Sequence, residues 1–381
     1  MNCCIVAHDV ARNEGQGRIN YELVRHLLAC GDRVEIVGDK VAPDLVGDGA
    51  ARFIRVPVRC RKPNLLKVRA FATGANACVR ARRARFDVVI GNGYVLTEPH
   101  DVNLCQFVHG CWIQSPVHVS RVRTGPYAWY QYQYSYWNAR WEKKAYAAAR
   151  VTVAPSNKIR QELLTIGLPP DRVQVIFNGV DLDEFRPGEA NRADWQLPAG
   201  VPLGLFVGDI RTPRKNLDTT LKALAQAPGV HLAVVGALER SPFPEMATRL
   251  GIADRVHFLG FRRDVARVMR ACDFFAFPSR YEAGSLVLLE AMASGLPVLT
   301  ATSAGGSELA EGDCGLVMDD PDDLASLAQG MRELAADESL RKRQGATARR
   351  VAEQHAWRRM AEEYRELAQG LAARHARPIA V

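Results

Sequence analysis

Short, continuous runs of apolar residues alternate with amphipathic stretches along the whole chain. Glycine, proline or aspartate bounds most of these runs, which is typical of buried strands in parallel sheets. Helical spacing is clear where Ile19, Leu23 and Leu27 share one face and Gly31 follows as a helix stop. The expected strands occupy residues 3–8, 33–37, 53–56, 87–90, 104–108, 151–154, 173–177, 203–207, 231–235, 256–259, 274–277, 297–300 and 315–317, and further helices are expected at residues 217–224, 266–271, 286–293 and 324–334.

Strands that alternate with helices indicate doubly wound parallel sheets, and here the pattern runs twice, which predicts two α/β domains. A chain of 381 residues is also too long for one ordinary hydrophobic core. Glycine and proline crowd residues 178–202, which marks the seam, and the tail from about Arg341 is helical without strands. We expect an N-terminal domain over residues 1–184, a second domain over residues 185–352, and a C-terminal helix over residues 353–381.

The composition is that of a globular protein, with 48% apolar and 24% charged residues, and it excludes a disordered chain. No apolar run reaches the roughly 18 residues that a membrane span needs, and residues 1–10 predict a strand rather than a signal peptide. The nine cysteines show no zinc-binding spacing. We therefore expect reduced thiols in a cytoplasmic protein.

The net charge of +8 is confined to the first half of the chain. Residues 1–190 hold 26 Lys and Arg against 18 Asp and Glu, and residues 51–85 hold 11 basic residues with no acid. Such a distribution favours one anionic partner surface, which could be nucleic acid, phospholipid or a phosphorylated substrate. A merely solvated basic face remains the alternative.

The segment from residue 277 to residue 298 carries most of the chemical information. A strand is expected to end at Pro278 and a helix to begin near Ser285, so the N–H groups of Gly284, Ser285 and Leu286 should form an anion site at the positive end of the helix dipole. Two glutamates, Glu282 and Glu290, flank this cradle, and carboxylates accept hydrogen bonds from sugar hydroxyls. The alternative, a capping glutamate beside a surface glutamate, is disfavoured by the Pro-Ser before the pair and the Glu-Ala-Met-Ala-x-Gly-x-Pro-Val after it.

A second candidate is the loop Gly208-Asp-Ile-Arg-Thr-Pro-Arg-Lys215, which follows a strand and precedes a helix. Lys215 could place a positive charge on a diphosphate as the leaving group gains charge. Arg211 could supply a second positive contact. Solvated basic residues in an ordinary loop are the alternative.

In the first half, Gly15 and Gly17 lie between the first strand and the first helix, where glycines let the backbone approach a ligand closely. A dinucleotide-binding fingerprint is a weaker interpretation, because its third glycine is Asn20. His109 follows an expected strand at the carboxyl edge of the sheet, where such sheets bind ligands. A lone histidine can equally be structural.

Two further patterns remain ambiguous. Asp181-Leu-Asp183 has the letters of a metal-binding DxD, but in the seam it favours capping and linker chemistry. Residues 112–141 interleave aromatic side chains with arginine. These aromatic residues could pack in the core, lie at a lipid headgroup interface or, least favoured, stack on nucleic-acid bases.

The segment from Glu282 to Glu290 resembles the E-x7-E signature of retaining GT-B glycosyltransferases of family 4, in a form similar to that of lipopolysaccharide-core glucosyltransferases. The resemblance extends over nearly the whole chain. Residues 177–181 resemble the start of the family's interdomain linker, residues 208–215 its phosphate loop, and residues 256–260 its base-contacting strand. Two departures stand out, because Ala-Gly-Ser at 283–285 replaces the usual Gly-Phe-Gly and Asp209 replaces a common arginine.

The resemblance implies a GT-B fold, with two Rossmann-like doubly wound domains facing a cleft and C-terminal helices packing back toward the N-terminal domain. In the family the C-terminal domain binds the nucleotide sugar and the N-terminal domain the acceptor. By this resemblance His109, Lys215 and Glu282 are the expected catalytic residues, and the expected donor-binding residues are Gly15, Gly17, Arg211, Gly284, Ser285, Leu286 and Glu290.

We therefore expect a retaining enzyme that moves a hexose from a nucleotide sugar, UDP-sugar before GDP-mannose, to a lipid-linked or cell-envelope glycan. No metal and no cofactor besides the donor is expected. The partners would include an anionic membrane surface, met peripherally from the cytoplasm, and no nucleic acid. A NAD-type oxidoreductase that uses Gly15 and Gly17, or a non-catalytic binder of anionic polymers, remains an alternative.

Overall fold

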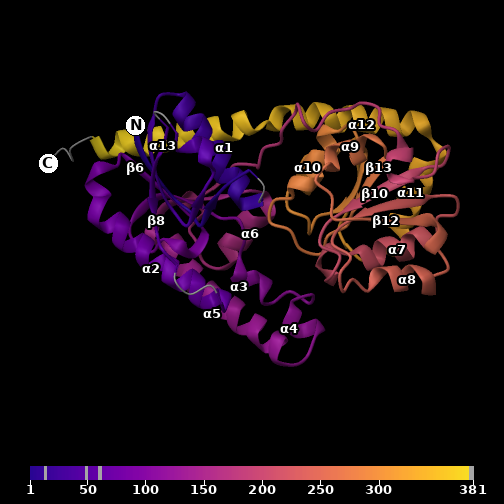
Figure 1. Cartoon of the computed structure of the whole chain (residues 1–381), viewed down its shortest axis with the longest axis horizontal. Helices are drawn as coiled ribbons and strands as arrows, with labels where there is room; N and C mark the ends of the chain where they lie inside the picture. Colours follow the sequence, from indigo (N-terminus) through magenta and orange to yellow (C-terminus); the bar gives the residue numbers. More distant parts are fainter. Residues whose placement is uncertain (13–14, 48–49, 59–61, 377–381) are drawn as a thin grey trace. The chain divides into compact units, whose positions relative to one another are not determined.

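The computed structural model describes residues 1–12, 15–47, 50–58 and 62–376, and the remaining residues lie outside the description. The chain divides into two compact units, each with its own parallel sheet (Figure 1). Unit 1 comprises residues 1–179 together with the chain from Trp357 onward, and unit 2 comprises Val180–Ala356. We describe each unit by itself.

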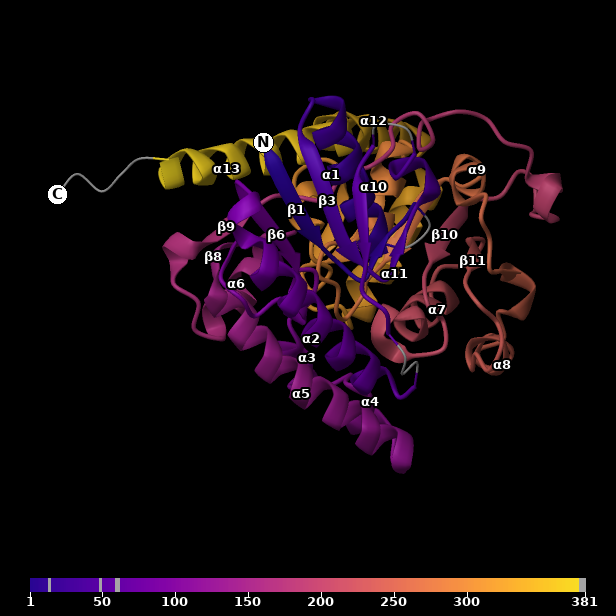
Figure 2. The same ribbon diagram turned by 60° about the vertical axis from the view of Figure 1, so that its left-hand side comes forward.

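Unit 1 is built on a parallel sheet of seven strands in the order β5-β3-β1-β6-β7-β8-β9. Helices α1 and α13 pack against each other on one side of the sheet, and α2 and α5 lie on the other side (Figures 1 and 2). The strands are β1 (Asn2–Val6), β3 (Arg33–Gly38), β5 (Arg52–Arg55), β6 (Val88–Asn92), β7 (His100–Leu104), β8 (Ala149–Ala154) and β9 (Val173–Val175), and the short strands β2 (Asp9–Val10) and β4 (Lys40–Val41) form a separate pair. The helices are α1 (Gly15–Ala29), α2 (Asn64–Arg82), α3 (His109–Trp112), α4 (Val119–Val122), α5 (Pro126–Ala148), α6 (Asn157–Thr165) and α13 (Trp357–Ala376).

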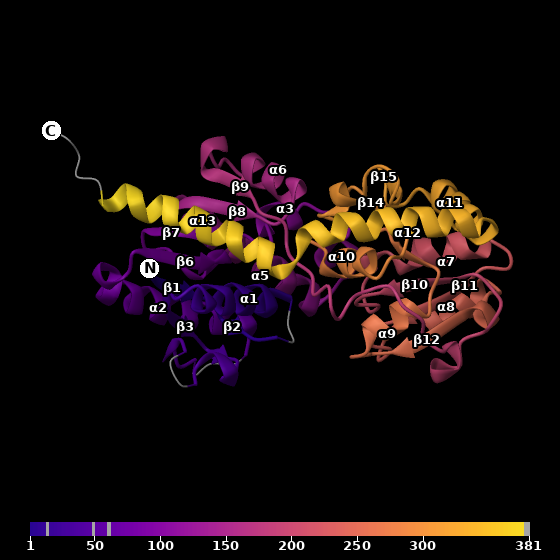
Figure 3. The same ribbon diagram turned by 90° about the horizontal axis from the view of Figure 1, so that it is seen from above.

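Unit 2 is built on a parallel sheet of six strands in the order β12-β11-β10-β13-β14-β15. Its central strand Phe274–Phe277 is wholly apolar and buried, because helices cover both faces of the sheet (Figure 3). The strands are β10 (Leu203–Val207), β11 (His231–Val235), β12 (Val256–Gly260), β13 (Phe274–Phe277), β14 (Val298–Ala301) and β15 (Gly315–Met318). The helices are α7 (Leu217–Ala225), α8 (Phe243–Arg249), α9 (Val265–Arg270), α10 (Leu286–Ala293), α11 (Leu324–Ala336) and α12 (Glu338–Ala352).

These two doubly wound sheets confirm the fold class expected from the sequence. The C-terminal helix α13 belongs to unit 1, where Arg365 donates to Asp32 at 2.7 Å and α13 packs along α1. The units meet in sequence at Gly179 and again at Trp357, close to the boundaries expected at residues 184 and 353.

One strand was placed wrongly from the sequence. The strand expected at residues 104–108 is β7, His100–Leu104. Residues 105–108 lie beyond its end, although the N–H of Cys105 still donates to the carbonyl of Val153 on β8 at 2.9 Å. Polar His100 and Asp101 hid this strand, yet both side chains are buried. The Asp101 carboxylate is satisfied there by the N–H of Val89 and by the guanidinium of Arg83, each at 2.9 Å.

The cysteines of the described residues are all free thiols, and five of the eight are buried, as expected of space-filling residues. Cys60 lies outside the described residues. No described helix has both the length and the apolar character that a membrane crossing requires.

Candidate active site

In unit 2, two cations meet one carboxylate at the carboxyl end of the sheet. Lys215 Nζ donates to Glu282 Oε1, and Arg214 Nη1 donates to the same oxygen at 3.1 Å. We call Arg214, Lys215 and Glu282 the cationic cluster. Burial lowers the pKa of Lys215, although the charge of Glu282 opposes that effect. Lys215 and Glu282 were both expected at the site, whereas Arg214 was missed.

The turn that carries these cations is held by a second set of charged groups. The turn spans Pro213–Lys215, and Arg280 donates to the carbonyl of Pro213 at 2.8 Å. The same guanidinium forms ion pairs with Asp218 at 2.7 Å and Asp322 at 2.6 Å. Because Arg280 is anchored by two carboxylates, it fixes the turn rather than adding a cation to the cluster.

Helix α10 begins beside Glu282, but its N-terminus differs from the expectation. The N–H of Ser285 donates to the carbonyl of Gly305 at 2.8 Å, so it cannot bind an anion in this structure. The hydroxyl of Ser285 accepts from the N–H of Leu288 at 3.3 Å. Among the described residues, the first-turn amides that lack a protein acceptor are those of Leu286 and Val287.

The remaining expected donor-binding residues of unit 2 occupy separate positions. Glu290 lies half-buried in the second turn of α10. Arg211 is half-exposed and pairs with Asp209 at 2.8 Å. Burial would raise the pKa of Asp209, but the hydrogen bonds and charge of Arg211 lower it. The structure thus joins Arg214, and not Arg211, to Lys215 and Glu282.

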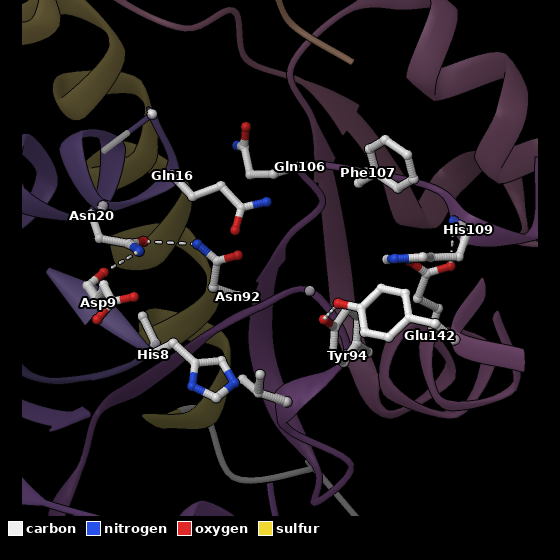
Figure 4. A pocket seen from close by; sticks show the side chains of 16 residues that line it. His8, Asp9, Gln16, Asn20, Asn92, Tyr94, Gln106, Phe107, His109 and Glu142 are labelled. Atoms are coloured by element: carbon white, nitrogen blue, oxygen red, sulfur yellow. Dashed lines mark hydrogen bonds and ion pairs between the residues drawn. The ribbon is translucent and has the colours of Figure 1, made fainter. Parts of the chain in front are cut away.

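Unit 1 contains a cavity of about 410 Å³, which we call the unit 1 cavity (Figure 4). It brings together the three residues that the sequence singled out in this half, namely Gly15, Gly17 and His109. Its lining comprises Ala7, His8, Asp9, Gly15, Gln16, Gly17, Asn20, Asn92, Gly93, Tyr94, Val95, Gln106, Phe107, His109, Tyr134 and Glu142.

His109 is fixed by a buried carboxylate that the sequence analysis missed. Glu142 accepts from the backbone N–H of His109 at 2.8 Å and also binds its ring Nδ1. Asn138 Nδ2 lies 3.3 Å from the other ring nitrogen, Nε2. Burial raises the pKa of Glu142, while His109 lowers it. The missed signal was Ser135, Asn138 and Glu142, three buried polar residues at helical spacing on one face of α5.

Aromatic rings enclose the His109 side chain. Phe107 lies edge-on at a centroid distance of 4.8 Å, and Tyr94 and Tyr134 lie at 5.4 and 5.8 Å. The two tyrosine hydroxyls are 3.3 Å apart. This end of the cavity therefore combines an oriented imidazole with apolar walls (Figure 4).

Asp181 has a capping role, as its position in the seam suggested. Its carboxylate accepts from the N–H of Asp183 at 3.2 Å and of Glu184 at 3.0 Å. In the part of the chain that the structure describes, no group of three or more His, Cys, Asp or Glu side chains is placed to hold a metal ion.

Comparison with known proteins identifies the family to which the chain belongs. The family profile described as "Glycosyltransferase Family 4" matches residues 13–184, and that described as "Glycosyl transferases group 1" matches residues 188–351. The two profiles together account for most of the chain. The chain therefore belongs to the glycosyltransferase family that these profiles describe, and its two parallel-sheet units are those of the GT-B fold.

Curated relatives match part of the chain. It is 39% identical over 168 residues to proteins named D-inositol 3-phosphate glycosyltransferase from Mycobacterium tuberculosis (strain ATCC 25618 / H37Rv) and Mycobacterium bovis (strain ATCC BAA-935 / AF2122/97). The match covers 42% of this chain and 35% of each relative. It thus spans about a third of the length of these relatives.

Solved structures match the fold over nearly the whole chain. The lipopolysaccharide-biosynthesis glycosyltransferase WaaG has a TM-score of 0.75 at 23% identity, with 97% of this chain and all of that chain covered. Sucrose-phosphate synthase from Thermosynechococcus elongatus has a TM-score of 0.77 at 21% identity, covering 98% and 99% of the two chains. The Anabaena protein HepE, solved with UDP-glucose, has a TM-score of 0.72 at 20% identity, covering 98% and 100%.

Proposed function

We propose that the protein is a retaining glycosyltransferase that moves a hexose from a nucleotide sugar to a lipid-linked or cell-envelope glycan. A UDP-sugar is the favoured donor and GDP-mannose the next. The observation that carries the proposal is the cationic cluster, in which the half-buried side chains of Lys215 and Arg214 meet Glu282 next to the first turn of α10. The structure of HepE with UDP-glucose supports the choice of donor.

Unit 2 would hold the donor by its diphosphate. Lys215 and Arg214 supply positive charge, and the N–H groups of Leu286 and Val287 supply donors at the positive end of α10. These groups are already fixed in the protein, so they stabilise the leaving nucleotide without reorganising as its charge grows. Two cations and a helix N-terminus can do this without a divalent metal.

Glu282 and Glu290 would bind hydroxyl groups of the donor. Glu282 is tied to residues 303–305 through its backbone, with its N–H donating to Ser303 and its carbonyl accepting from Gly305, each at 3.2 Å. Its carboxylate is thereby held in place to accept from the transferred sugar. Glu290 on α10 would accept from the ribose hydroxyls.

Retention of the anomeric configuration would follow from attack on the face that the nucleotide leaves. The bond from the anomeric carbon to the phosphate oxygen breaks, and the bond to the acceptor oxygen forms on the same side. The acceptor proton passes to the departing phosphate oxygen. Glu282, paired with two cations, is poorly suited to be the nucleophile of a double displacement.

A thermal-shift screen with UDP-, GDP- and ADP-sugars tests the donor assignment. A donor at 100 times its Kd adds about 2.7 kcal/mol of stability. A UDP-sugar should stabilise the wild-type protein most, and the control variant Lys222→Ala, changed at an exposed position of α7, should respond equally. Stabilisation by NAD and by no nucleotide sugar would instead support the oxidoreductase alternative.

The acceptor would be met at a membrane surface. On α5 the side chains of Tyr127, Trp129, Tyr132, Tyr136 and Trp137 are all exposed, which excludes the core interpretation for these residues. Basic α2 lies beside them, since Arg69 stacks over the ring of Trp141 at 5.6 Å. Exposed aromatic residues next to cations suit the headgroup region of an anionic bilayer.

A further inference from the structure

The unit 1 cavity has two ends, the aromatic end that holds His109 and a polar end (Figure 4). Four carboxamides line it, and an imidazole joins them, from several different elements of unit 1. We call this the carboxamide wall, and its members are His8, Gln16, Asn20, Asn92 and Gln106.

His8 brings unused hydrogen-bonding capacity to this wall. Both of its ring nitrogens are buried, and neither has a hydrogen-bond partner among the described residues. Its ring packs on Phe71 at a centroid distance of 3.9 Å, which fixes its plane. Burial, aided by the charge of Lys67, lowers the pKa of His8 to about 4. The imidazole is therefore neutral near pH 7 and offers one donor and one acceptor.

Gln106 contributes a second unused group. Its side chain is 9% exposed, and its Nε2 is buried without an acceptor in the described part of the chain. A buried amide nitrogen without a hydrogen-bond partner is destabilising, because burial removes its bonds to water and nothing replaces them. Such a cost is recovered when a ligand supplies the missing acceptor.

Asn20 and Asn92 are already oriented by each other. Asn92 Nδ2 donates to Asn20 Oδ1 at 3.0 Å, and Asn20 Nδ2 donates to the carbonyl of Asp9 at 3.2 Å. The first of these hydrogen bonds uses the amide nitrogen of Asn92, and the side-chain carbonyl oxygen of Asn92 points away from Asn20 (Figure 4). The wall therefore presents both acceptors and donors in fixed positions.

The charge of the lining favours an uncharged ligand. The described lining residues include the carboxylates of Asp9 and Glu142 but no lysine or arginine. Lys67, on α2, acts on His8 from outside the lining. Each hydroxyl group both donates and accepts, as does each carboxamide, whereas a phosphate only accepts and would meet two carboxylates.

We propose that the carboxamide wall binds the hydroxyl groups of an uncharged, polyhydroxylated ring, a sugar or a cyclitol, that forms the accepting end of the acceptor. The inference rests on the proposed function, because it assigns the acceptor of that reaction. It separates this chain from its curated relatives, whose name specifies a phosphorylated inositol. Any charged part of the acceptor would lie outside the unit 1 cavity.

Binding of defined small probes to the full chain tests this assignment. The probes are glucose and myo-inositol, each compared with its monophosphate, and the readout is saturation-transfer NMR with a titrated Kd. The neutral compounds should bind at least tenfold more tightly than their phosphates. Gln106→Leu and His8→Phe should each weaken neutral binding several-fold, as loss of a hydrogen bond to a neutral group does.

Lys67→Gln is the matched control, because it removes the nearby charge without touching the wall. It should leave neutral binding unchanged. The inference would be overturned if the monophosphates bound more tightly than the neutral compounds and Lys67→Gln abolished that binding. It would also be overturned if the neutral compounds did not bind, or if Gln106→Leu and His8→Phe both bound them with wild-type affinity. Affinity for UDP-glucose is measured in parallel and reports on the folding of each variant. If donor binding fails in the wild type, the proposed function fails, whatever the sugars do.

Discussion

The carboxylate of Glu142 binds His109 twice, through the backbone N–H at 2.8 Å and through ring Nδ1. Two bonds from one buried carboxylate fix both the start of α3 and the plane of the imidazole. A proton on Nδ1 leaves Nε2 as the acceptor of the ring, and the amide Nδ2 of Asn138 lies 3.3 Å from it. Glu142 is thus a positioning residue for a group at the aromatic end of the unit 1 cavity.

Replacing Glu142 with glutamine should therefore impair turnover more than donor binding. Glu142→Gln keeps the size of the side chain but cannot accept both bonds as strongly, so kcat should fall tenfold or more while the KM for the donor changes little. The ¹⁵N shifts of the His109 ring should move as its tautomers mix. The control is Glu98→Gln, which alters a partly exposed ion pair with Arg80. Unchanged ¹⁵N shifts and unchanged kcat would refute the positioning role.

Substitutions at Lys215 and Glu290 should affect different kinetic constants, because the two side chains are proposed to contact different parts of the donor. Lys215→Ala removes a cation that acts on developing charge, so kcat should drop by ~10²-fold or more. Glu290→Gln removes a ribose contact that changes little during transfer, so it should mainly raise the KM for the donor. Steady-state kinetics of both variants checks this, and equal losses confined to donor affinity would contradict the assignment.

Activity should survive removal of divalent metal. The prediction follows from Lys215, Arg214 and the first turn of α10, which together can neutralise a diphosphate. Transfer is measured before and after dialysis against EDTA. Activity that disappears and returns only with Mn²⁺ or Mg²⁺ would show that the diphosphate needs a cation the protein does not provide.

Unit 1 should bind anionic bilayers reversibly. Each Lys or Arg near such a surface is worth about 1 kcal/mol, and exposed Trp129 and Tyr127 can add interfacial contacts. The protein should co-sediment with vesicles that contain anionic lipid, less at high salt, and not with neutral vesicles.

Charge reversal provides the control for membrane binding. Glutamate at Arg59, Arg61, Lys62 and Lys67 should release the protein from anionic vesicles while UDP-glucose affinity stays constant. Arg59 and Arg61 lie outside the described residues, so their part in this variant rests on sequence alone. If the wild-type protein does not co-sediment with anionic vesicles at low salt, the basic residues serve to bind a soluble phosphorylated acceptor or to keep the protein soluble.

Acid should destabilise the protein partly through His8. Its pKa is lowered in the folded state to about 4, so the unfolded chain binds a proton that the folded chain rejects. Stability from this source is present above about pH 6.5 and is lost as the pH falls toward 4. His8→Gln should flatten that part of the curve, as measured by urea unfolding between pH 7 and pH 4. Burial also lowers the pKa of His100, so the unfolding free energy of the variant still depends on pH. The same pH dependence in the wild type and in His8→Gln would contradict the prediction.

The sequence predicted the strands of unit 2 closely because they are continuous apolar runs. Residues 203–207 and 274–277 are strands as expected, because a strand covered on both faces is apolar throughout. The β7 strand was misplaced because His100 and Asp101 are polar. Asp101 is accommodated in the interior by Arg83 and Val89, which are 18 and 12 residues away in the sequence.

Some residues of the candidate site could be named from the sequence, and others could not. Lys215 and Glu282 lie between a strand and the following helix, and His109 begins helix α3. A strand–loop–helix pattern in the sequence points to such positions. Glu142 and Arg214 act through contacts over 33 and 68 residues, which no local pattern encodes. The bond from Ser285 to Gly305 likewise depends on a loop distant in sequence.

Retaining glycosyl transfer is tested by following a UDP-sugar by NMR in the presence of the protein and a glycan or polyol acceptor. Wild-type protein should release UDP and form a product with the anomeric configuration of the donor, and Lys215→Ala should release ~10²-fold less UDP. An inverted product would contradict the retaining mechanism. Absence of nucleotide release from UDP-, GDP- and ADP-sugars alike would contradict glycosyl transfer itself.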